Sequence, residues 1–271
     1  MKKQLVTLMI VTVLALALAA CGLLQEPEEA SGTIEAIPLA TQAAGVATEA
    51  VAATEPPAEE PATTEPAAEA VPTEAPVEPT TAPEPTAEAA PTGAATTFTI
   101  DSAASQVRFQ LDEDLRGVRT TVVGTTDQVA GQLAVNLADL SQTQVGVIQI
   151  NARTLVTDNN FRNRAIQNEI LDTGDYEFIT FTPTAVEGLP ASAAIGETIT
   201  FTLVGDLTIR DVTLPATFTV EATAVSDTQI TGTATAVVNR ADFGLQIPSV
   251  PNVANVEEEV ELYIDFTANA S

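Results

Sequence analysis

The chain has 271 residues, with 10 lysines and arginines against 37 aspartates and glutamates, so its formal net charge is -27. It contains no histidine, no tryptophan and one cysteine. The absence of histidine excludes Ser-His-Asp and Cys-His catalysis and imidazole metal sites. The negative charge argues against a nucleic-acid partner, because such a partner requires a basic patch.

The N-terminus has the pattern of an export signal. Two lysines precede an uncharged run of 16 residues, Leu5 to Ala20, which is shorter than the ~20 residues that a membrane-spanning helix needs. The run ends in Leu-Ala-Ala before Cys21, which resembles the bacterial lipobox, where the cysteine is acylated. We expect residues 1–20 to be removed and Cys21 to anchor an extracytoplasmic lipoprotein to the cell membrane, at the cell surface or in the periplasm. The alternative is a secreted protein with an incidental cysteine.

Residues 21–96 have the composition of a spacer. Between residues 22 and 96 lie 12 of the 17 prolines and 14 glutamates, with no aspartate, lysine, arginine or aromatic residue. Frequent prolines interrupt helices and sheets, and unbalanced charge expands the chain, so the segment is predicted to be disordered. At ~3.1 Å per residue it extends up to about 200 Å, which favours a tether. Binding of a cationic partner or divalent ions is the alternative, and glycosylation of its threonines stays open.

Residues 97–271 form the predicted folded domain. They contain all nine phenylalanines, both tyrosines and eight arginines. Apolar and polar residues alternate with a period of two, as in Ile199 to Arg210, Phe218 to Ala224 and Val260 to Thr267, which is typical of strands with one buried face. Such runs predict about eight or nine antiparallel strands in a barrel or a sandwich. Residues 158–171 carry apolar residues at helical spacing, so a short helix is expected there.

Several segments along the domain carry a recognisable order of motifs. They are Phe98–Asp101, Ser105–Phe109, Gly131, Ile148–Asn151, Thr157–Asn159, Phe161–Asn163, Phe178–Phe181, Gly205–Pro215 and Asn239–Gly244. In order and spacing they resemble the YceI family, small barrels of the bacterial envelope that hold a polyisoprenoid chain. The resemblance implies an antiparallel lipocalin-like β-barrel of about eight strands with one short helix. Family members carry histidines near the first hairpin and in the helical region, and this chain lacks them. The family's way of binding the lipid head group is therefore the property that the resemblance transfers least well to this chain.

The barrel interior is the expected ligand site. Several apolar faces mix large residues with small ones such as Gly131, Ala222, Gly232 and Ala234, so side chains alone are expected to under-fill it. An isoprenoid lipid, a quinone or a prenyl phosphate, would complete the core, as the resemblance implies. The predicted lining is Phe98, Ile100, Val107, Phe109, Leu133, Val135, Ile148, Ile150, Phe201, Leu203, Phe218, Val220, Leu262, Ile264 and Phe266. In the alternative, the small residues lie at strand crossings of a packed barrel and these residues form an ordinary core.

Arginine is the second informative residue type, because eight arginines face 23 acidic residues in the domain. Guanidinium groups bind phosphate oxygens in a bidentate way, so a cluster at the barrel mouth would hold a prenyl phosphate head. The candidates lie in or beside turns and the predicted helix: Arg162, Arg164, Arg210 and Arg240. In the alternative each pairs with a nearby carboxylate, which the neighbouring Asp211 and Asp242 favour for the last two.

No catalytic or metal site is predicted. The chain has no histidine and no second cysteine, and acidic groups at residues 112–114 and 257–259 are interpreted as hairpin and strand-edge charges rather than a glycosidase pair. No cofactor is expected apart from a bound lipid. We predict a membrane-anchored protein that sequesters or carries a polyisoprenoid-type lipid and is not an enzyme, with a homodimer left open. The alternative is a structural or interaction module with a filled barrel.

Overall fold

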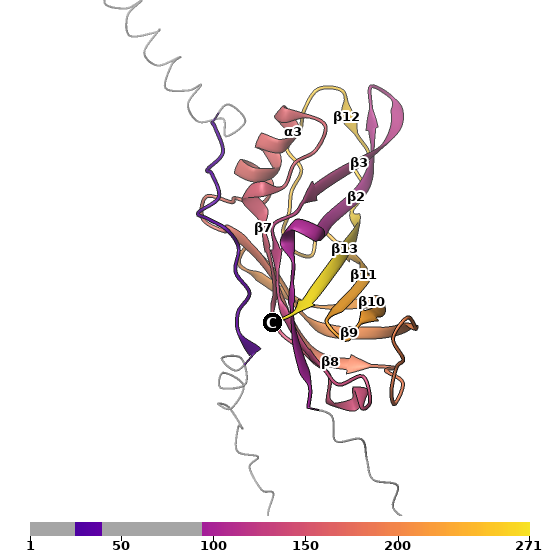
Figure 1. The fold of residues 1–271 in the computed structure, drawn as a ribbon. Helices are drawn as coiled ribbons and strands as arrows, with labels where there is room; N and C mark the ends of the chain where they lie inside the picture. Colours follow the sequence, from indigo (N-terminus) through magenta and orange to yellow (C-terminus); the bar gives the residue numbers. More distant parts are fainter. Residues whose placement is uncertain (1–24, 40–93) are drawn as a thin grey trace, which may run out of the picture.

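The computed structural model describes residues 25–39 and 94–271. The predicted signal, Cys21 and most of the predicted spacer lie outside these residues. The described domain has thirteen strands in one antiparallel sheet (Figure 1). They are β1 (Thr96–Ile100), β2 (Gln106–Leu115), β3 (Val118–Thr126), β4 (Val129–Ala130), β5 (Gln132–Val135), β6 (Gln144–Val145), β7 (Ile148–Asn151), β8 (Phe178–Glu187), β9 (Thr198–Ile209), β10 (Val212–Ser226), β11 (Gln229–Asn239), β12 (Val253–Ala254) and β13 (Glu259–Ala270). The predicted all-β fold is confirmed, and the strands outnumber the prediction because several are pieces of two to four residues.

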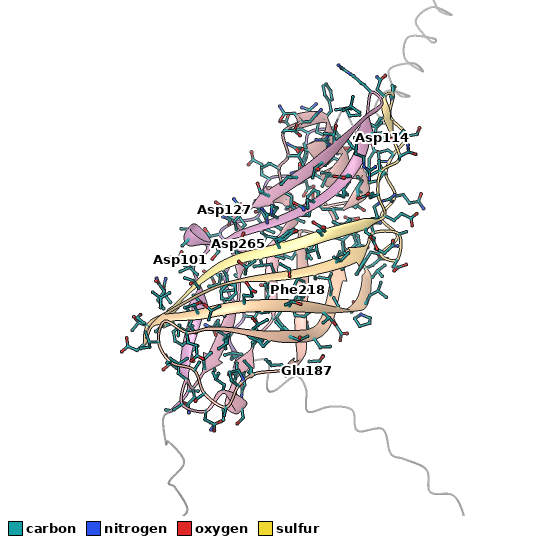
Figure 2. All side chains as sticks on the ribbon, turned by 90° about the vertical axis from the view of Figure 1, so that its right-hand side faces the viewer. Asp101, Asp114, Asp127, Glu187, Phe218 and Asp265 are labelled. Carbon is teal, nitrogen blue, oxygen red and sulfur yellow. The ribbon has the colours of Figure 1, made fainter. Side chains whose placement is uncertain are left out.

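Alternating residues place one face of each long strand inside the curled sheet. In β10 the buried Ala216, Phe218 and Val220 alternate with exposed threonines and with Glu221. All of β9 pairs without a break with residues 212–223 of β10, so their inward residues stay in register. Figure 2 shows side chains on both faces of these strands, with Phe218 on β10 and the exposed Asp265 on β13. The period-two pattern therefore separates the core from the solvent-facing surface.

The sheet closes on itself around Gly131. β4 pairs with β7, and one residue further along the chain β5 pairs with β1. One stretch of chain thus joins both ends of the strand order β7-β8-β9-β10-β11-β13-β1. A Cβ atom at Gly131 would lie 2.5 Å from Cδ1 of Ile148 and 3.2 Å from Cδ1 of Ile100, so the terminal methyl groups of these two side chains occupy the space beside this glycine.

Phenylalanine rings occupy the space beside the other inward glycines. A Cβ atom at Gly232 would lie 2.7 Å from Cζ of Phe266, and one at Gly205 would lie 2.7 Å from Cζ of Phe181. The Phe181 ring in turn packs edge-on against the Phe218 ring, with 4.8 Å between the centroids. These small residues make room for rings, so they do not by themselves leave the barrel under-filled. Around these glycines the packing agrees with the alternative prediction, in which the small residues belong to a core filled by side chains.

The helical segment covers one end of the barrel. Helix α3 spans Asn160–Ala165 and continues as a π-helical turn, η5, over Ile166–Ile170, within the predicted range 158–171. The Asn159 side chain caps its start by accepting hydrogen bonds from the amides of Phe161 and Arg162, at 2.9 and 3.3 Å,. The helix lies at the end of the molecule that carries the β2–β3 hairpin (Figure 1). We call this end the α3 end.

Residues 25–39 lie along the domain, and we call them the N-terminal strap (Figure 1). They belong to the range predicted as spacer, but Ile34 is buried. The Asn168 side-chain amide donates to the Gln25 carbonyl at 2.8 Å, and the Leu39 amide donates to Oε1 of Gln132 at 3.3 Å. Both isoleucines of the predicted spacer, at positions 34 and 37, fall in this segment, and they give it apolar surface that can be buried.

Candidate functional site: an apolar cavity at the α3 end

Three apolar cavities follow one another along the barrel interior. Their volumes are about 160, 70 and 50 Å³. Alternate residues of β13 give their order, because Leu262 lines the first cavity, Ile264 the second, and Phe266 both the second and the third. A cavity of ~150 Å³ lined by aliphatic and aromatic side chains holds a molecule of benzene size. The first cavity therefore accommodates a ring or a short branched segment, and the two smaller ones extend the apolar path.

The first cavity lies beneath α3 and is almost entirely apolar. Its walls come from β2, β8, β9, β11 and β13, from the helical segment and from the loop after β11. The apolar lining includes Phe109, Leu111, Ile166, Ile170, Ile179, Ile209, Val238, Phe243, Leu245 and Leu262. Only three charged residues line it, Glu113, Arg162 and Arg240. An apolar chamber with a few polar groups at one end suits an amphipathic ligand.

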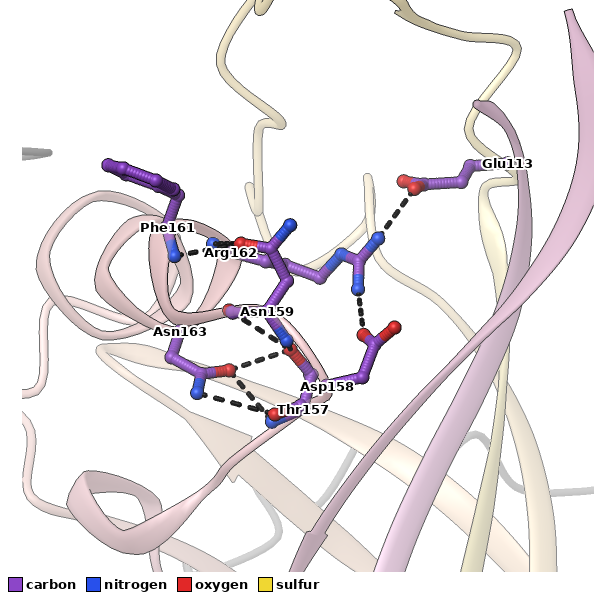
Figure 3. Close-up of polar contacts among 7 residues, drawn as sticks. All are labelled: Glu113, Thr157, Asp158, Asn159, Phe161, Arg162 and Asn163. Atoms are coloured by element: carbon purple, nitrogen blue, oxygen red, sulfur yellow. Dashed lines mark hydrogen bonds and ion pairs between the residues drawn. The ribbon is translucent and has the colours of Figure 1, made fainter. Parts of the chain in front are cut away.

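Arg162 and Glu113 form a buried ion pair at this end. Nη2 of Arg162 lies 2.7 Å from Oε1 of Glu113, and Nη1 lies 2.5 Å from Oδ1 of Asp158 (Figure 3). The Glu113 side chain is 7% exposed and the Arg162 side chain 18%. Asn163 holds the preceding loop by accepting hydrogen bonds from the amide and hydroxyl of Thr157, both at 2.7 Å. The loop and helix start are thereby fixed, and they direct the guanidinium into the barrel.

Arg240 has a different set of partners. Its guanidinium donates to the carbonyls of Glu257, Leu245 and Val256 at 2.9, 3.0 and 3.4 Å. Within residues 94–271 and the strap, no carboxylate lies within ion-pair distance of this group, so the expected pairing with Asp242 does not form. The three hydrogen bonds tie the segment after β11 to the start of β13. Arg240 therefore holds the loop that closes the cavity and keeps its own charge uncompensated by an acid.

The structure brings together most of the residues predicted to line the lumen. Phe109 and Leu262 line the first cavity. The second and third cavities are lined by Ile100, Leu133, Val135, Ile148, Phe201, Leu203, Phe218, Val220, Ile264 and Phe266. Phe98, Val107 and Ile150 are buried in the core but line none of the three cavities. They act as packing residues, because neighbouring side chains fill the space in front of them.

The four predicted head-group arginines separate into two groups. Arg162 and Arg240 line the first cavity, whereas Arg164 and Arg210 line none of the three. Arg210 lies in the β9–β10 turn with a positive φ of 58°. Its guanidinium lies over the Tyr176 ring, 5.7 Å from the centroid, and donates to the Ile170 carbonyl at 3.4 Å. Arg210 thus supports the end of the helical segment from outside the cavity.

Sequence reasoning missed Glu113 and the loop residues of this site. The sequence predicts Glu113 as a hairpin charge, but in the structure it continues the alternation of Phe109 and Leu111 on the inward face of β2. The two-residue spacing of positions 109, 111 and 113 is the signal in the sequence that indicates an inward Glu113. Leu245, Ile247 and Val256 lie in the irregular segment between β11 and β13. No periodic pattern marks such residues, so only the tertiary structure places them over the cavity.

Across residues 25–39 and 94–271, none of the helices combines the length and the apolar character needed to cross a bilayer. In the same residues, no group of three or more metal-binding side chains is arranged to hold a metal ion.

Comparisons with known proteins bear on the fold and the family. The model of the YceI-like domain matches residues 98–268. A polyisoprenoid binding domain from Saccharophagus degradans, implicated in plant cell wall breakdown, is 16% identical, with a TM-score of 0.52 over 65% of this chain and 99% of that one. BcnA of Burkholderia cenocepacia is 20% identical, with a TM-score of 0.50 over 63% and 99%. No curated protein matched. These solved structures support the fold, and the family match covers more than half of the sequence, so the chain belongs to the family of YceI-like domains.

Proposed function

We propose that this protein binds a polyisoprenoid-type lipid inside the barrel, with the lipid's head at the α3 end. The observation that carries the proposal is the first cavity, which is apolar over most of its wall and has Glu113, Arg162 and Arg240 at one end. Membership of the YceI-like family and the polyisoprenoid binding described for the S. degradans domain support it. The arrangement serves binding rather than catalysis, since the charged groups are engaged with one another or with backbone.

The charges around the cavity favour an uncharged head group over a phosphate. Arg162 is already compensated by Glu113 and Asp158, so only Arg240 offers a free positive charge. The domain as a whole carries eight arginines against 23 acidic residues, which repels an anion. A quinone carbonyl or an alcohol would accept or donate hydrogen bonds here without this repulsion. We therefore place a quinone or a prenyl alcohol ahead of a prenyl phosphate.

The anchored location is also part of the proposal. Acyl chains on Cys21 would attach the protein to a membrane on the extracytoplasmic side, because stable anchoring follows when more than one chain is buried. The pattern of residues 1–21 supports this. A membrane-attached barrel of this kind would sequester or carry lipid at the cell envelope.

The test is lipid binding by the full chain and by a matched pair of variants. Val238 lines the first cavity, whereas its neighbour Val237 is 62% exposed on the outer face of β11. We expect Val238→Trp to weaken binding of farnesol and of a short-chain ubiquinone at least tenfold, because the indole fills the cavity, and Val237→Trp to leave binding unchanged. Farnesyl phosphate should bind more weakly than farnesol. Equal binding by both variants, or no binding by the wild type, would overturn the proposal.

Depth of insertion is measured separately. Leu203 lines the second cavity, so Leu203→Trp should weaken binding of long-chain ligands more than that of farnesol. Native mass spectrometry of protein isolated from its host should show a co-purifying isoprenoid. The packing of phenylalanine rings beside Gly205 and Gly232 favours the competing function, a filled interaction module, and a ligand-free mass for every preparation would support that alternative.

A further inference from the structure

The N-terminal strap is attached to the barrel by a specific polar site. Arg153 is at its centre, with a side chain that is 12% exposed. Its guanidinium pairs with Glu28 at 2.9 Å and donates to the Glu29 carbonyl at 3.1 Å, while its other hydrogen bonds go to the carbonyls of Thr173 and Gly174. The domain thus holds one of its few cations ready for the strap's acidic segment.

A second anchor point lies beside the first. Oε1 of Glu177 accepts hydrogen bonds from the amide and the hydroxyl of Ser31, at 2.8 and 2.9 Å. Asn151 donates to the same oxygen at 2.8 Å, and Arg153 lies 3.3 Å from the other carboxylate oxygen. Two residues of the domain, Asn151 and Arg153, therefore position the Glu177 carboxylate for Ser31 of the strap. Together with the buried Ile34, these contacts fix the strap's course along the barrel.

The strap's direction decides which end of the barrel meets the lipid anchor. Its first described residue, Gln25, is bonded to Asn168 of η5, and the neighbouring Ile166 and Ile170 line the first cavity. Gln25 is only four positions after Cys21 in the sequence. A fully extended chain spans at most ~3.6 Å per residue, which is about 14 Å in total. The attached lipid must therefore lie close to the α3 end.

The long segment of residues 40–93 does not set this distance. Leu39 is bonded to Gln132 of β5, and the chain returns at β1, where Thr99 pairs with the same Gln132. Both ends of the segment are therefore held at neighbouring strands of the domain. While the strap is docked, the segment is a connection within the domain and not a tether of up to about 200 Å.

We infer that the strap holds the α3 end of the barrel against the membrane that contains the Cys21 lipid, so that the first cavity takes up its ligand directly from that bilayer. This inference rests on the anchor in the proposed function. Phe161 on α3 is 65% exposed at this end, where an aromatic side chain can enter the bilayer interface. The domain's negative charge gives it no attraction to anionic lipids, so the docked strap, rather than surface charge, must supply the orientation.

Energy transfer to membrane lipids tests the inference on the lipidated full chain. Cys21 is the only cysteine of the sequence, and in the lipidated chain its sulfur would carry the proposed lipid, so an introduced cysteine is the single labelling site. Val118 at the β2–β3 turn is 65% exposed at the α3 end, and Asp227 lies in the β10–β11 turn near Ala224 and Ile230 of the third cavity. Donor-labelled Val118→Cys and Asp227→Cys proteins are placed in phosphatidylcholine vesicles that contain an acceptor lipid. We expect at least twofold higher transfer from position 118.

Two further variants separate the strap from the spacer. Ile34→Asp combined with Ser31→Ala should release the strap, and transfer from position 118 should fall to that from position 227. Deletion of residues 41–90 should leave transfer from position 118 unchanged, because the strap sets the distance. Equal transfer from both positions in the unmodified strap, or a rise in transfer at both on deletion, would overturn the inference.

Failure of the proposed function gives a different result. A chain that does not partition into vesicles lacks the anchor, and this result overturns the inference. Lipid binding by the barrel is then tested independently by the farnesol assay in solution. A chain that binds vesicles with the expected orientation but takes up no farnesol retains the strap's role and loses the lipid-binding proposal.

Discussion

Arg162 has two tasks in this structure. It brings a positive charge to the end of an apolar cavity, and it permits Glu113 to lie there with a side chain only 7% exposed. A carboxylate in such a place costs several kcal/mol unless a cation and hydrogen bonds compensate it. Because Glu113 and Asp158 already compensate the guanidinium, this group offers no net positive charge to an anion.

Breaking the pair on one side should be costly. We expect Arg162→Met to lower the free energy of unfolding by about 3–5 kcal/mol, because Glu113 is left buried without a partner. Urea denaturation measures the change. The double variant Arg162→Met with Glu113→Leu should recover most of the loss, since no unpaired charge remains. A single variant as stable as the wild type would show that water reaches Glu113 without its partner.

Glu177 makes the strap sensitive to acid. Burial raises the pKa of Glu177, but hydrogen bonds from Ser31 and Asn151 and the charge of Arg153 lower it, and the net pKa lies below the ordinary value of 4.5. A carboxyl group with a depressed folded pKa stabilises the folded state above its unfolded pKa, and this stabilisation is lost as the pH falls through the folded value. The strap should therefore stay docked at neutral pH and loosen below pH 4.5.

The amide resonance of Ser31 reports this transition, because its hydrogen bond ends on the titrating carboxylate. In a pH titration by NMR, its chemical shift should move with a midpoint below 4.5 in the wild type. In Glu177→Gln the strap should be loosened at all pH values and this titration should be absent. A wild-type midpoint at or above 4.5 would contradict the stabilising role of the strap contacts.

Among the elements, the paired β8, β9 and β10 show how far alternation predicts structure. The inward residues of β9 and β10 follow from the sequence because each of these two strands keeps one face buried over many residues. The pairing of glycines with rings was not predictable in the same way. Gly205 on β9 pairs with Pro183 of β8, and the ring of Phe181, two residues away on β8, fills the space beside the glycine. This arrangement depends on register, which the period alone does not specify.

Adding a methyl group at Gly205 should therefore destabilise the barrel. A Cβ atom there would lie 2.8 Å from Cα of Pro183 as well as 2.7 Å from the Phe181 ring, so the backbone itself must shift. We expect Gly205→Ala to cost about 1–3 kcal/mol of unfolding free energy, measured by chemical denaturation. Gly32→Ala is the control, because a Cβ atom there meets nothing within 4 Å. Equal effects of the two substitutions would contradict this packing argument.

At the scale of the whole molecule, strap docking closes residues 40–93 into a connection between two sites on the domain. If this segment is as disordered as its composition predicts, shortening it by half should favour docking by about 0.6 kcal/mol, because loop closure costs less entropy. Hydrogen exchange at the Ser31 and Leu39 amides should slow about threefold. A chain in which residues 40–93 are replaced by a Gly-Ser sequence of unchanged length serves as the control. Unchanged exchange in the shortened chain would mean that the segment does not behave as a free loop.

The sequence by itself determined the antiparallel β-fold, the short helix and most of the residues that face the interior. These follow from local periodicity. In a strand every second residue faces the interior, and in a helix every third or fourth residue does. It also determined that histidine chemistry has no part in the site. Residues from the irregular loop after β11 and the inward Glu113 could not be assigned in this way.

Only the tertiary structure decided which arginines meet the cavity, which small residues serve aromatic rings, and where residues 25–39 lie. Each of these depends on contacts between residues distant in the sequence, such as Arg162 with Glu113 and Arg153 with Glu28. Composition predicted a uniform spacer because it averages over a segment. Within that segment Ile34 is buried and Ser31 binds Glu177 of the domain. The free energy of these contacts depends on a surface that forms only when the sheet has closed.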